Sequence, residues 1–149
     1  MGSWAKRAAV ALGLLALTAL PAAAQVPDVF ARELAGKLAR AESLLTENGY
    51  ARAAGPFPGA LSDNQSRRQT VMLRAGQDYR IVGVCDSNCG DFDIRVFDAN
   101  NRLIAQDVLQ DNVPVVHVVP NATGQYSIEP TMARCAVQQC WYAFNVYSR

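Results

Sequence analysis

Histidine is almost absent from this chain of 149 residues, in which His117 is the only one. A single histidine excludes the H-E-x-x-H zinc site, which needs two histidines on one helix face. The sequence also lacks the G-x-x-x-x-G-K loop that binds nucleotide phosphates and the G-x-S-x-G turn that presents a catalytic serine. We therefore predict no catalytic residue and no enzymatic activity.

The first part of the chain contains its one long apolar run. Lys6 and Arg7 precede small and apolar residues from 8 to 20, and three alanines at 22–24 follow. This order predicts a secretory signal peptide over residues 1–24. The run is shorter than the roughly 20 residues of a spanning helix, so we expect no transmembrane segment in the mature chain.

The mature chain also lacks an excess of basic residues. Without Lys6 and Arg7, 12 basic residues face 13 acidic ones. A chain of that charge has no positive field to attract nucleic acid or an anionic membrane. We expect an exported protein, periplasmic or secreted, that does not bind nucleic acid.

The four cysteines lie in the second half of the chain, at positions 85, 89, 135 and 140. In an exported protein an even number predicts disulfides, and four cysteines allow three connectivities. Spacing favours Cys85 with Cys89 and Cys135 with Cys140, each closing a short turn. A zinc site with four thiolates is the alternative, but an oxidising compartment disfavours it.

A single helix is predicted over Asp28–Glu47, where apolar residues recur every three or four positions. Asp28 is the expected N-cap, and Asn48 with Gly49 the expected end. The proline and glycine cluster at 55–59 cannot continue a helix and marks a boundary. We therefore divide the mature chain into a helical segment with linker, 25–54, and a second domain, 55–149. The helix either covers one end of that domain or docks on a partner.

From residue 60 onward, short runs rich in β-branched and aromatic residues come about every ten positions, separated by turn residues. They lie near 69–73, 79–84, 92–97, 102–106, 114–119, 125–129 and 141–147. Within these runs apolar and polar residues alternate, as at Phe92, Ile94 and Val96 against Asp91, Asp93 and Arg95. The pattern predicts an all-β fold, an antiparallel jelly-roll-like β-sandwich preceded by one N-terminal α-helix.

The order of motifs resembles a known family. VMLRAGQDYRIVGVC at 71–85 is followed by DFDIRVFDANN at 91–101, an acidic loop, a valine-rich strand, and ATGQYSIEP at 122–130. This succession is similar to the bacterial pre-peptidase C-terminal (PPC) type of β-sandwich, and the likeness covers residues 69–147. The resemblance implies a non-catalytic module of exported proteins, often appended to secreted enzymes. We expect a stand-alone exported relative without an attached enzyme, in which the two cysteine-bracketed turns are additional.

Two groups of residues are candidate binding sites. Asp86, Asn88, Asp91 and Asp93 offer oxygen ligands within eight residues, which suits calcium, although the EF-hand register is absent. Hydrogen-bonded turns, with Asp93 beside Arg95 and Arg80, are the structural alternative. Trp141 and Tyr147, which face away from the inward aromatic residues of the last strand, are the candidate ligand face.

We therefore expect a non-catalytic binding or structural module of the cell envelope or secretome, with an envelope protein or polysaccharide as partner and no cofactor except calcium. One alternative is a small secreted hydrolase that uses carboxylates or His117. The other is a module that binds a protein partner through the N-terminal helix.

Overall fold

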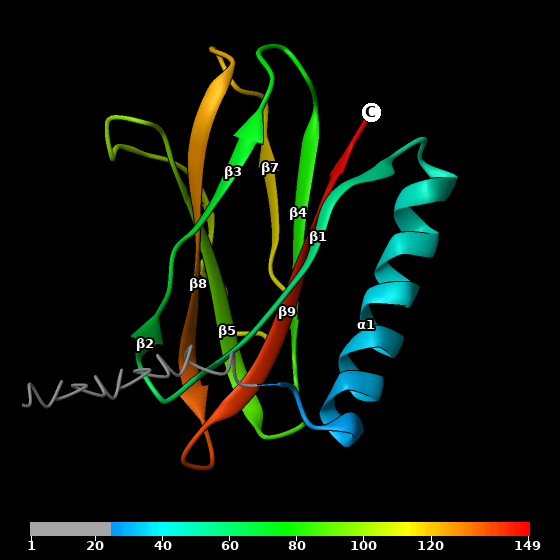
Figure 1. The fold of residues 1–149 in the computed structure, drawn as a ribbon, viewed down its shortest axis with the longest axis vertical. Coiled ribbons are helices and arrows are strands. Elements are labelled where there is room, and N and C mark those ends of the chain that lie inside the picture. Colours follow the sequence, from blue (N-terminus) through cyan, green and yellow to red (C-terminus); the bar gives the residue numbers. More distant parts are fainter. Residues whose placement is uncertain (1–24) are drawn as a thin grey trace, which may run out of the picture.

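The computed structural model describes residues 25–149, so the predicted signal peptide lies outside the described residues. Figure 1 shows two facing sheets with one helix along the outer side. None of the described residues forms a helix long and apolar enough to cross a membrane. In chain order the elements are α1 (Asp28–Glu47), β1 (Ala51–Leu61), β2 (Gln65–Ser66), β3 (Gln69–Leu73), β4 (Tyr79–Cys85), β5 (Cys89–Phe97), β6 (Leu103–Asp107), β7 (Val115–Val118), β8 (Gly124–Cys135) and β9 (Cys140–Ser148).

The strands form two antiparallel sheets. The first has the order β1-β9-β4-β7, and in the second β8 pairs with β2, β3 and β5, which in turn pairs with β6. The predicted antiparallel sandwich preceded by one helix is therefore confirmed. All seven predicted runs are strands, and β1 and β2 were not predicted.

The core lies between the two sheets and follows the alternation read from the sequence. Phe92, Ile94 and Val96 on β5 are fully buried, and they face Ile81 and Phe144 of the opposite sheet within one apolar cluster. Asp91, Asp93 and Arg95 point to the other side of β5, as side chains along a strand must alternate. The predicted inward faces of the central strands are confirmed.

Helix α1 begins and ends where the sequence predicts. The N-cap position is Pro27, however, and no side chain caps the helix, so the assignment of Asp28 as N-cap was wrong. Leu34 and Leu38 are buried against Val84 and Ala143 on the outer face of the first sheet. The helix thus covers a sheet face rather than one end of the domain.

Strand β1 crosses the expected boundary at residue 54. It pairs with β9 from Ala51 to Leu61, with register shifts on both sides of Ala54. These irregularities, and its place at the sheet edge, let the strand accommodate two prolines. Gly55 has a φ of 106°, and a Cβ there would lie 2.5 Å from Asn145 Oδ1. Residues 51–54, expected to be linker, are part of the sandwich.

Strands β4 and β5 belong to different sheets, and the turn between them carries the chain from one sheet to the other. The disulfide Cys85–Cys89 spans this turn, and Cys135–Cys140 spans the passage from β8 to β9. Cys89 lies opposite Cys135 in the β5–β8 pairing, so both bridges are at the same end. The predicted connectivity is confirmed, which rules out the zinc alternative for these thiols.

Candidate functional site

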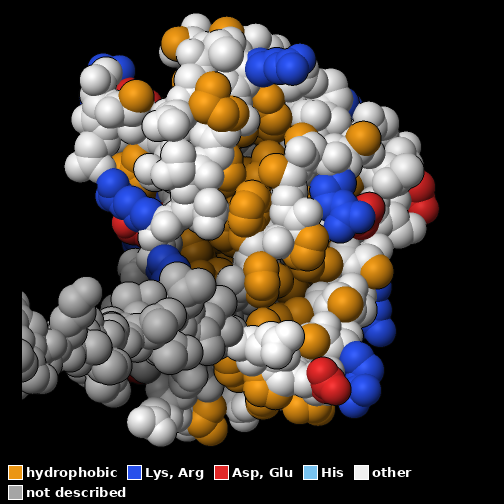
Figure 2. Space-filling model, in the orientation of Figure 1, with side chains coloured by type: hydrophobic (Ala, Val, Ile, Leu, Met, Phe, Trp, Pro, Cys, Tyr) orange, Lys and Arg blue, Asp and Glu red, His pale blue; other side chains and the backbone are white. Residues whose placement is uncertain are grey.

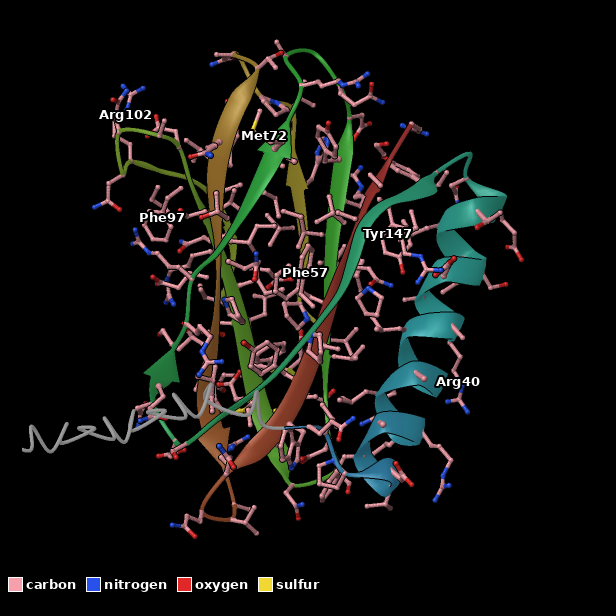
Figure 3. All side chains as sticks on the ribbon, viewed as in Figure 1. Arg40, Phe57, Met72, Phe97, Arg102 and Tyr147 are labelled. Atoms are coloured by element: carbon pink, nitrogen blue, oxygen red, sulfur yellow. A yellow bond between two sulfur atoms is a disulfide. The ribbon has the colours of Figure 1, made fainter. Side chains whose placement is uncertain are left out.

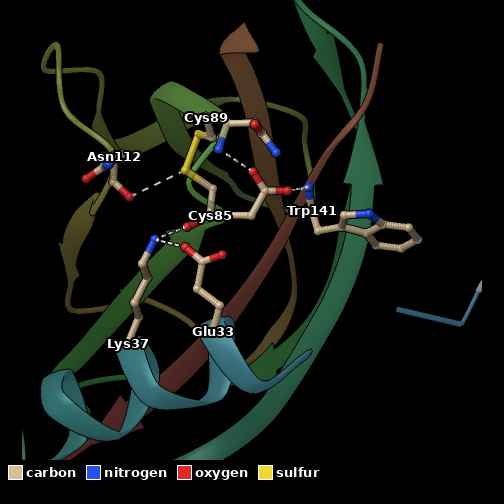
Figure 4. A network of polar contacts seen from close by, with 8 residues as sticks. Glu33, Lys37, Cys85, Cys89, Asn112 and Trp141 are labelled. Atoms are coloured by element: carbon tan, nitrogen blue, oxygen red, sulfur yellow. Dashed lines mark hydrogen bonds and ion pairs between the residues drawn. A yellow bond between two sulfur atoms is a disulfide. The ribbon is translucent and has the colours of Figure 1, made fainter. Parts of the chain in front are cut away.

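The turn closed by Cys85 and Cys89 contains Asp86, the first candidate calcium ligand. Its side chain is fully buried. Oδ1 accepts a hydrogen bond from the Asn88 amide at 2.8 Å, and Oδ2 accepts one from the Trp141 amide at 2.7 Å. Figure 4 shows the disulfide turn of Cys85 and Cys89 beside Trp141 at the start of β9. Asp86 therefore attaches this turn to β9, and each of its carboxylate oxygens already accepts a backbone hydrogen bond.

The other candidate ligands lie apart from Asp86. Asp91 and Asp93 are on the outer side of the second sheet, and Asp93 Oδ2 is 3.7 Å from the Arg95 guanidinium. Arg80, the other expected neighbour of Asp93, is on the first sheet instead. Among residues 25–149 no three acidic, histidine or cysteine side chains are arranged to hold a metal ion. Calcium binding by Asn88, Asp91 and Asp93 stays a prediction.

Asp93 on β5 is a carboxyl of the second sheet whose pKa is shifted upward. Burial raises the pKa of Asp93 above its ordinary value, and the nearby charge of Asp91 raises it further, while Arg95 opposes both. Asp107 and Asp111 add smaller effects in the same direction. We call Asp91, Asp93, Asp107 and Asp111 the acidic patch. It concentrates negative charge beside β6 and the loop that follows it.

Replacement of Asp93 by Asn tests whether the ionised carboxylate of Asp93 destabilises the folded protein. Because the folded-state pKa is raised, the folded protein binds the proton more tightly, and stability is lost as pH rises through that pKa. We expect Asp93→Asn to raise the melting temperature by a few degrees at neutral pH, with the gain vanishing below the ordinary pKa of 3.8. Thermal unfolding measured across pH checks this.

Asp98 provides a control of opposite sign for that experiment. Backbone hydrogen bonds from Arg102 and Asn100 and the Arg102 charge outweigh desolvation and lower the pKa of Asp98. Asp98→Asn should therefore lower the melting temperature at neutral pH. If Asp93→Asn also lowers the melting temperature at neutral pH, the ionised carboxylate of Asp93 does not destabilise the folded protein.

The predicted ligand face is not exposed. Tyr147 is fully buried between β9 and α1 (Figure 3), and its hydroxyl accepts a hydrogen bond from Asn145 Nδ2 at 2.9 Å. Trp141 is half-buried, and its ring lies 6.4 Å from that of Phe30. The assignment of Tyr147 to a ligand face was wrong because helix α1 covers that side of β9.

His117 projects from the outer face of edge strand β7, the polar side expected for it. Its Nε2 lies 3.0 Å from Asp78 Oδ1. Burial raises the pKa of Asp78, but the Tyr50 hydroxyl and the charges of His117 and Arg80 outweigh burial and lower it. His117 lines a cavity of about 480 Å³ that also contains Thr123, whose hydroxyl accepts the Ala75 amide. The pair of Asp78 and His117 therefore has a positioned imidazole, but the hydroxyls of Thr123 and Tyr126 in this cavity form hydrogen bonds with the backbone instead.

The feature that the sequence did not predict is an exposed apolar surface at one side of the sandwich. Seven of the eleven exposed large apolar residues lie between positions 103 and 119. They come from β6, from the loop after it and from β7, which are edge strands of the two different sheets. We call these residues the β6–β7 edge: Leu103, Ile104, Val108, Leu109, Val113, Val115 and Val119.

The opposite side of the sandwich is also open. Figure 2 shows hydrophobic side chains in the trough between β1 and β3. A cavity of about 460 Å³ there is lined by Val71, Leu73, Tyr79 and Val146, which belong to the core. Met72 at its border is the one large apolar residue of β3 that is exposed. This trough is the open end of the core rather than a separate cluster of surface residues.

The arrangement defines a disulfide-stapled antiparallel sandwich with an apolar edge bordered by carboxylates. No family model and no curated protein matches the chain. Among solved structures, a periplasmic inhibitor of g-type lysozyme from Aeromonas hydrophila, PliG, is 18% identical, with a TM-score of 0.49 over 67% of this chain and 86% of that chain. The resemblance to the PPC family stays a prediction.

Proposed function

We propose that this chain is an exported, non-catalytic binding module of the cell envelope or secretome that binds another exported protein through the β6–β7 edge. The observation that carries the proposal is the concentration of exposed apolar residues there, since contiguous apolar surface marks interaction sites. Two disulfides support export to an oxidising compartment, periplasmic or extracellular.

A protein partner fits this edge better than a polysaccharide. The exposed residues are valine, leucine and isoleucine, whereas sugar rings stack on exposed aromatic side chains. Asp107 and Asp111 border the edge and belong to the acidic patch. A partner of complementary chemistry would present apolar residues framed by lysine and arginine, and opposite charge speeds such association.

The two other functions considered from the sequence have weaker support. The apolar stripe of α1 packs against β4 and β9, so the helix is not a free arm. Deleting residues 25–54 would remove the start of β1 and uncover buried Tyr147, and so could not isolate an interface. The hydrolase alternative has the Asp78 and His117 pair but no hydroxyl nucleophile in hydrogen bond with His117 among the described residues.

Photocrosslinking in the intact cell envelope tests the edge. A photoreactive amino acid replaces Leu109, which is 68% exposed on the β6–β7 edge, or Met72, which is 64% exposed on the opposite side. We expect a discrete adduct with one exported protein from position 109 and none from position 72. Equal adducts at both positions, or none at 109, would overturn the proposal.

Binding of the crosslinked partner, once purified, tests the charge complementarity. Asp111→Asn removes a charge while its carbonyl oxygen can still accept the Val113 amide, as the carboxylate does at 3.0 Å. We expect slower association and a weaker salt dependence, with Asp28→Asn on α1 as the matched control. Unchanged association of Asp111→Asn would contradict a role for the acidic patch.

A further inference from the structure

A second apolar surface, which shares Val113 and Val115 with the β6–β7 edge, is a groove between helix α1 and strand β7. Its volume of about 500 Å³ is within the usual range for ligand sites. Val82 and Val84 on the outer face of β4 form its almost fully buried floor, and its exposed apolar lining is Leu44, Val113 and Val115. We call it the helix groove and define it by the residues Lys37, Arg40, Ala41, Leu44, Leu45, Val82, Val84, Asn112, Val113 and Val115.

The helix groove has a polar end and an apolar end. Lys37 donates to the Cys85 carbonyl oxygen at 2.7 Å and pairs with Glu33 at 2.8 Å, as Figure 4 shows, which places the polar end near the disulfide turn. Towards the other end the lining is Ala41, Leu44 and Leu45. From Lys37 to Leu45 the helix rises about 12 Å. The groove therefore follows α1 for about 12 Å, with its polarity divided along its length.

Arg40 stands at the rim of this groove and gives it a free positive charge. Its side chain extends from α1 into solvent (Figure 3). It takes part in none of the ion pairs formed within residues 25–149. A guanidinium beside an apolar groove is suited to a carboxylate or phosphate, because it can bind either through two parallel hydrogen bonds.

The backbone around the groove argues against a peptide as occupant. Strand β4, which forms the floor, is paired on both sides, with β7 and with β9. On the outer wall, the amide of Val113 donates a hydrogen bond to the Asp111 carboxylate at 3.0 Å, and the amide of Val115 donates one to the Asp107 carboxylate at 2.9 Å. A peptide would therefore bury amide groups without partners, which is costly, whereas an aliphatic chain has none to satisfy.

From this geometry we infer that the helix groove binds a single-chain amphiphile with an anionic head, its chain between Leu44 and the valines 113 and 115 and its head at Arg40. A fatty-acid carboxylate and a lysophospholipid phosphate share this chemistry. The groove shares Val113 and Val115 with the β6–β7 edge, but Arg40 and Leu44 lie outside that edge, so the variants that test the two proposals differ. Burial of the aliphatic chain supplies the affinity, and the head sets the orientation.

Titration of the mature protein with dodecanoate below its micelle concentration tests the inference, followed by calorimetry and by the methyl NMR signals of the groove valines. We expect saturable binding that shifts Val82, Val84 and Val115. Leu44→Asp, at a position 64% exposed, should abolish binding without loss of thermal stability, and Val29→Asp, at 60%, is the matched control. Parallel titration with lysophosphatidylglycerol shows which head is preferred.

The role of the Arg40 charge in binding the anionic head is tested separately with Arg40→Glu. Arg32→Glu on the same helix is the control. We expect Arg40→Glu to weaken dodecanoate binding about tenfold and to leave binding of uncharged dodecanol unchanged. Three results would overturn the inference: no saturable binding of either anionic amphiphile, binding that survives Leu44→Asp, or a dimer in sedimentation that Leu44→Asp dissociates. Loss of the position-109 crosslink has no bearing on it.

Discussion

Replacing Asp86 by Ala should destabilise the protein by about 3–5 kcal/mol, because each buried amide left without an acceptor costs about 1–3 kcal/mol and the bonds to a carboxylate are stronger than neutral ones. The two amides belong to Asn88, in the turn after β4, and Trp141, at the start of β9. The Asp86 side chain thus attaches the turn between the two sheets to strand β9 of the first sheet. Urea unfolding with both disulfides intact measures the loss.

Two further variants separate this role from simple removal of charge. Asp86→Asn retains one carbonyl oxygen but directs an NH₂ group at the second amide, so most of the loss should persist. Asp98→Ala removes a comparable turn carboxylate that accepts the Asn100 and Arg102 amides in an exposed hairpin, where water can replace it. Its loss should be much smaller. An Asp86→Ala midpoint equal to that of Asp98→Ala would contradict the assignment.

Asp86 also shows what can and cannot be predicted from the sequence at a polar turn. The residue type and the flanking cysteines predict either a hydrogen-bonded turn or a calcium ligand, and both readings use the same oxygens. The partner that decides between them is the amide of Trp141, 55 positions away. No local pattern predicts a contact of that separation, because it exists only once β4 and β9 are paired.

Alternation predicts the two faces of a strand but not what covers each face. Tyr142, Phe144 and Val146 were correctly placed on the inner face of β9. The other face carries Ala143, Asn145 and Tyr147, and its polar appearance suggested an exposed surface. Helix α1 buries it instead, and the Tyr147 hydroxyl is satisfied by Asn145. The helix was predicted with correct bounds, but the face it covers was not.

The other differences between the predicted elements and the structure lie at residues that are typical of turns. Gly55, Pro56 and Pro58 indicate a break, and we used them to mark the boundary between the helical segment with its linker and the second domain. In the structure they lie in edge strand β1, where shifts in the pairing with β9 accommodate them. The acidic loop before Val113 entered the sequence analysis only as one motif of the resemblance to the PPC family. This loop contains two apolar residues, Val108 and Leu109, that are exposed in the structure. Because the segment lacks strand periodicity, these two residues were the sequence feature from which the β6–β7 edge could have been predicted.

Gly83 lies where β4 of the first sheet packs against β5 of the second, and Gly83→Val should destabilise the protein by about 3 kcal/mol. A Cβ at this position would lie 2.8 Å from both Ile94 Cδ1 and Phe92 Cε1 and 3.2 Å from Pro114 Cγ. Ile94 and Phe92 are fully buried on the opposite sheet, so neither can move into solvent. Overpacking of a filled core typically costs about 1–3 kcal/mol, and valine adds two further methyl groups.

Gly124→Val is the matched control, because Gly124 is also in a strand and a Cβ there would meet nothing within 4 Å. This variant should be neutral or slightly stabilising, since valine favours strands and loses less backbone entropy on folding than glycine. Gly83→Ala, which adds only the Cβ, should fall between the two in urea unfolding. If all three variants unfold at the wild-type midpoint, the sheets can separate at Gly83 without cost, and the packing between β4 and β5 does not set their spacing.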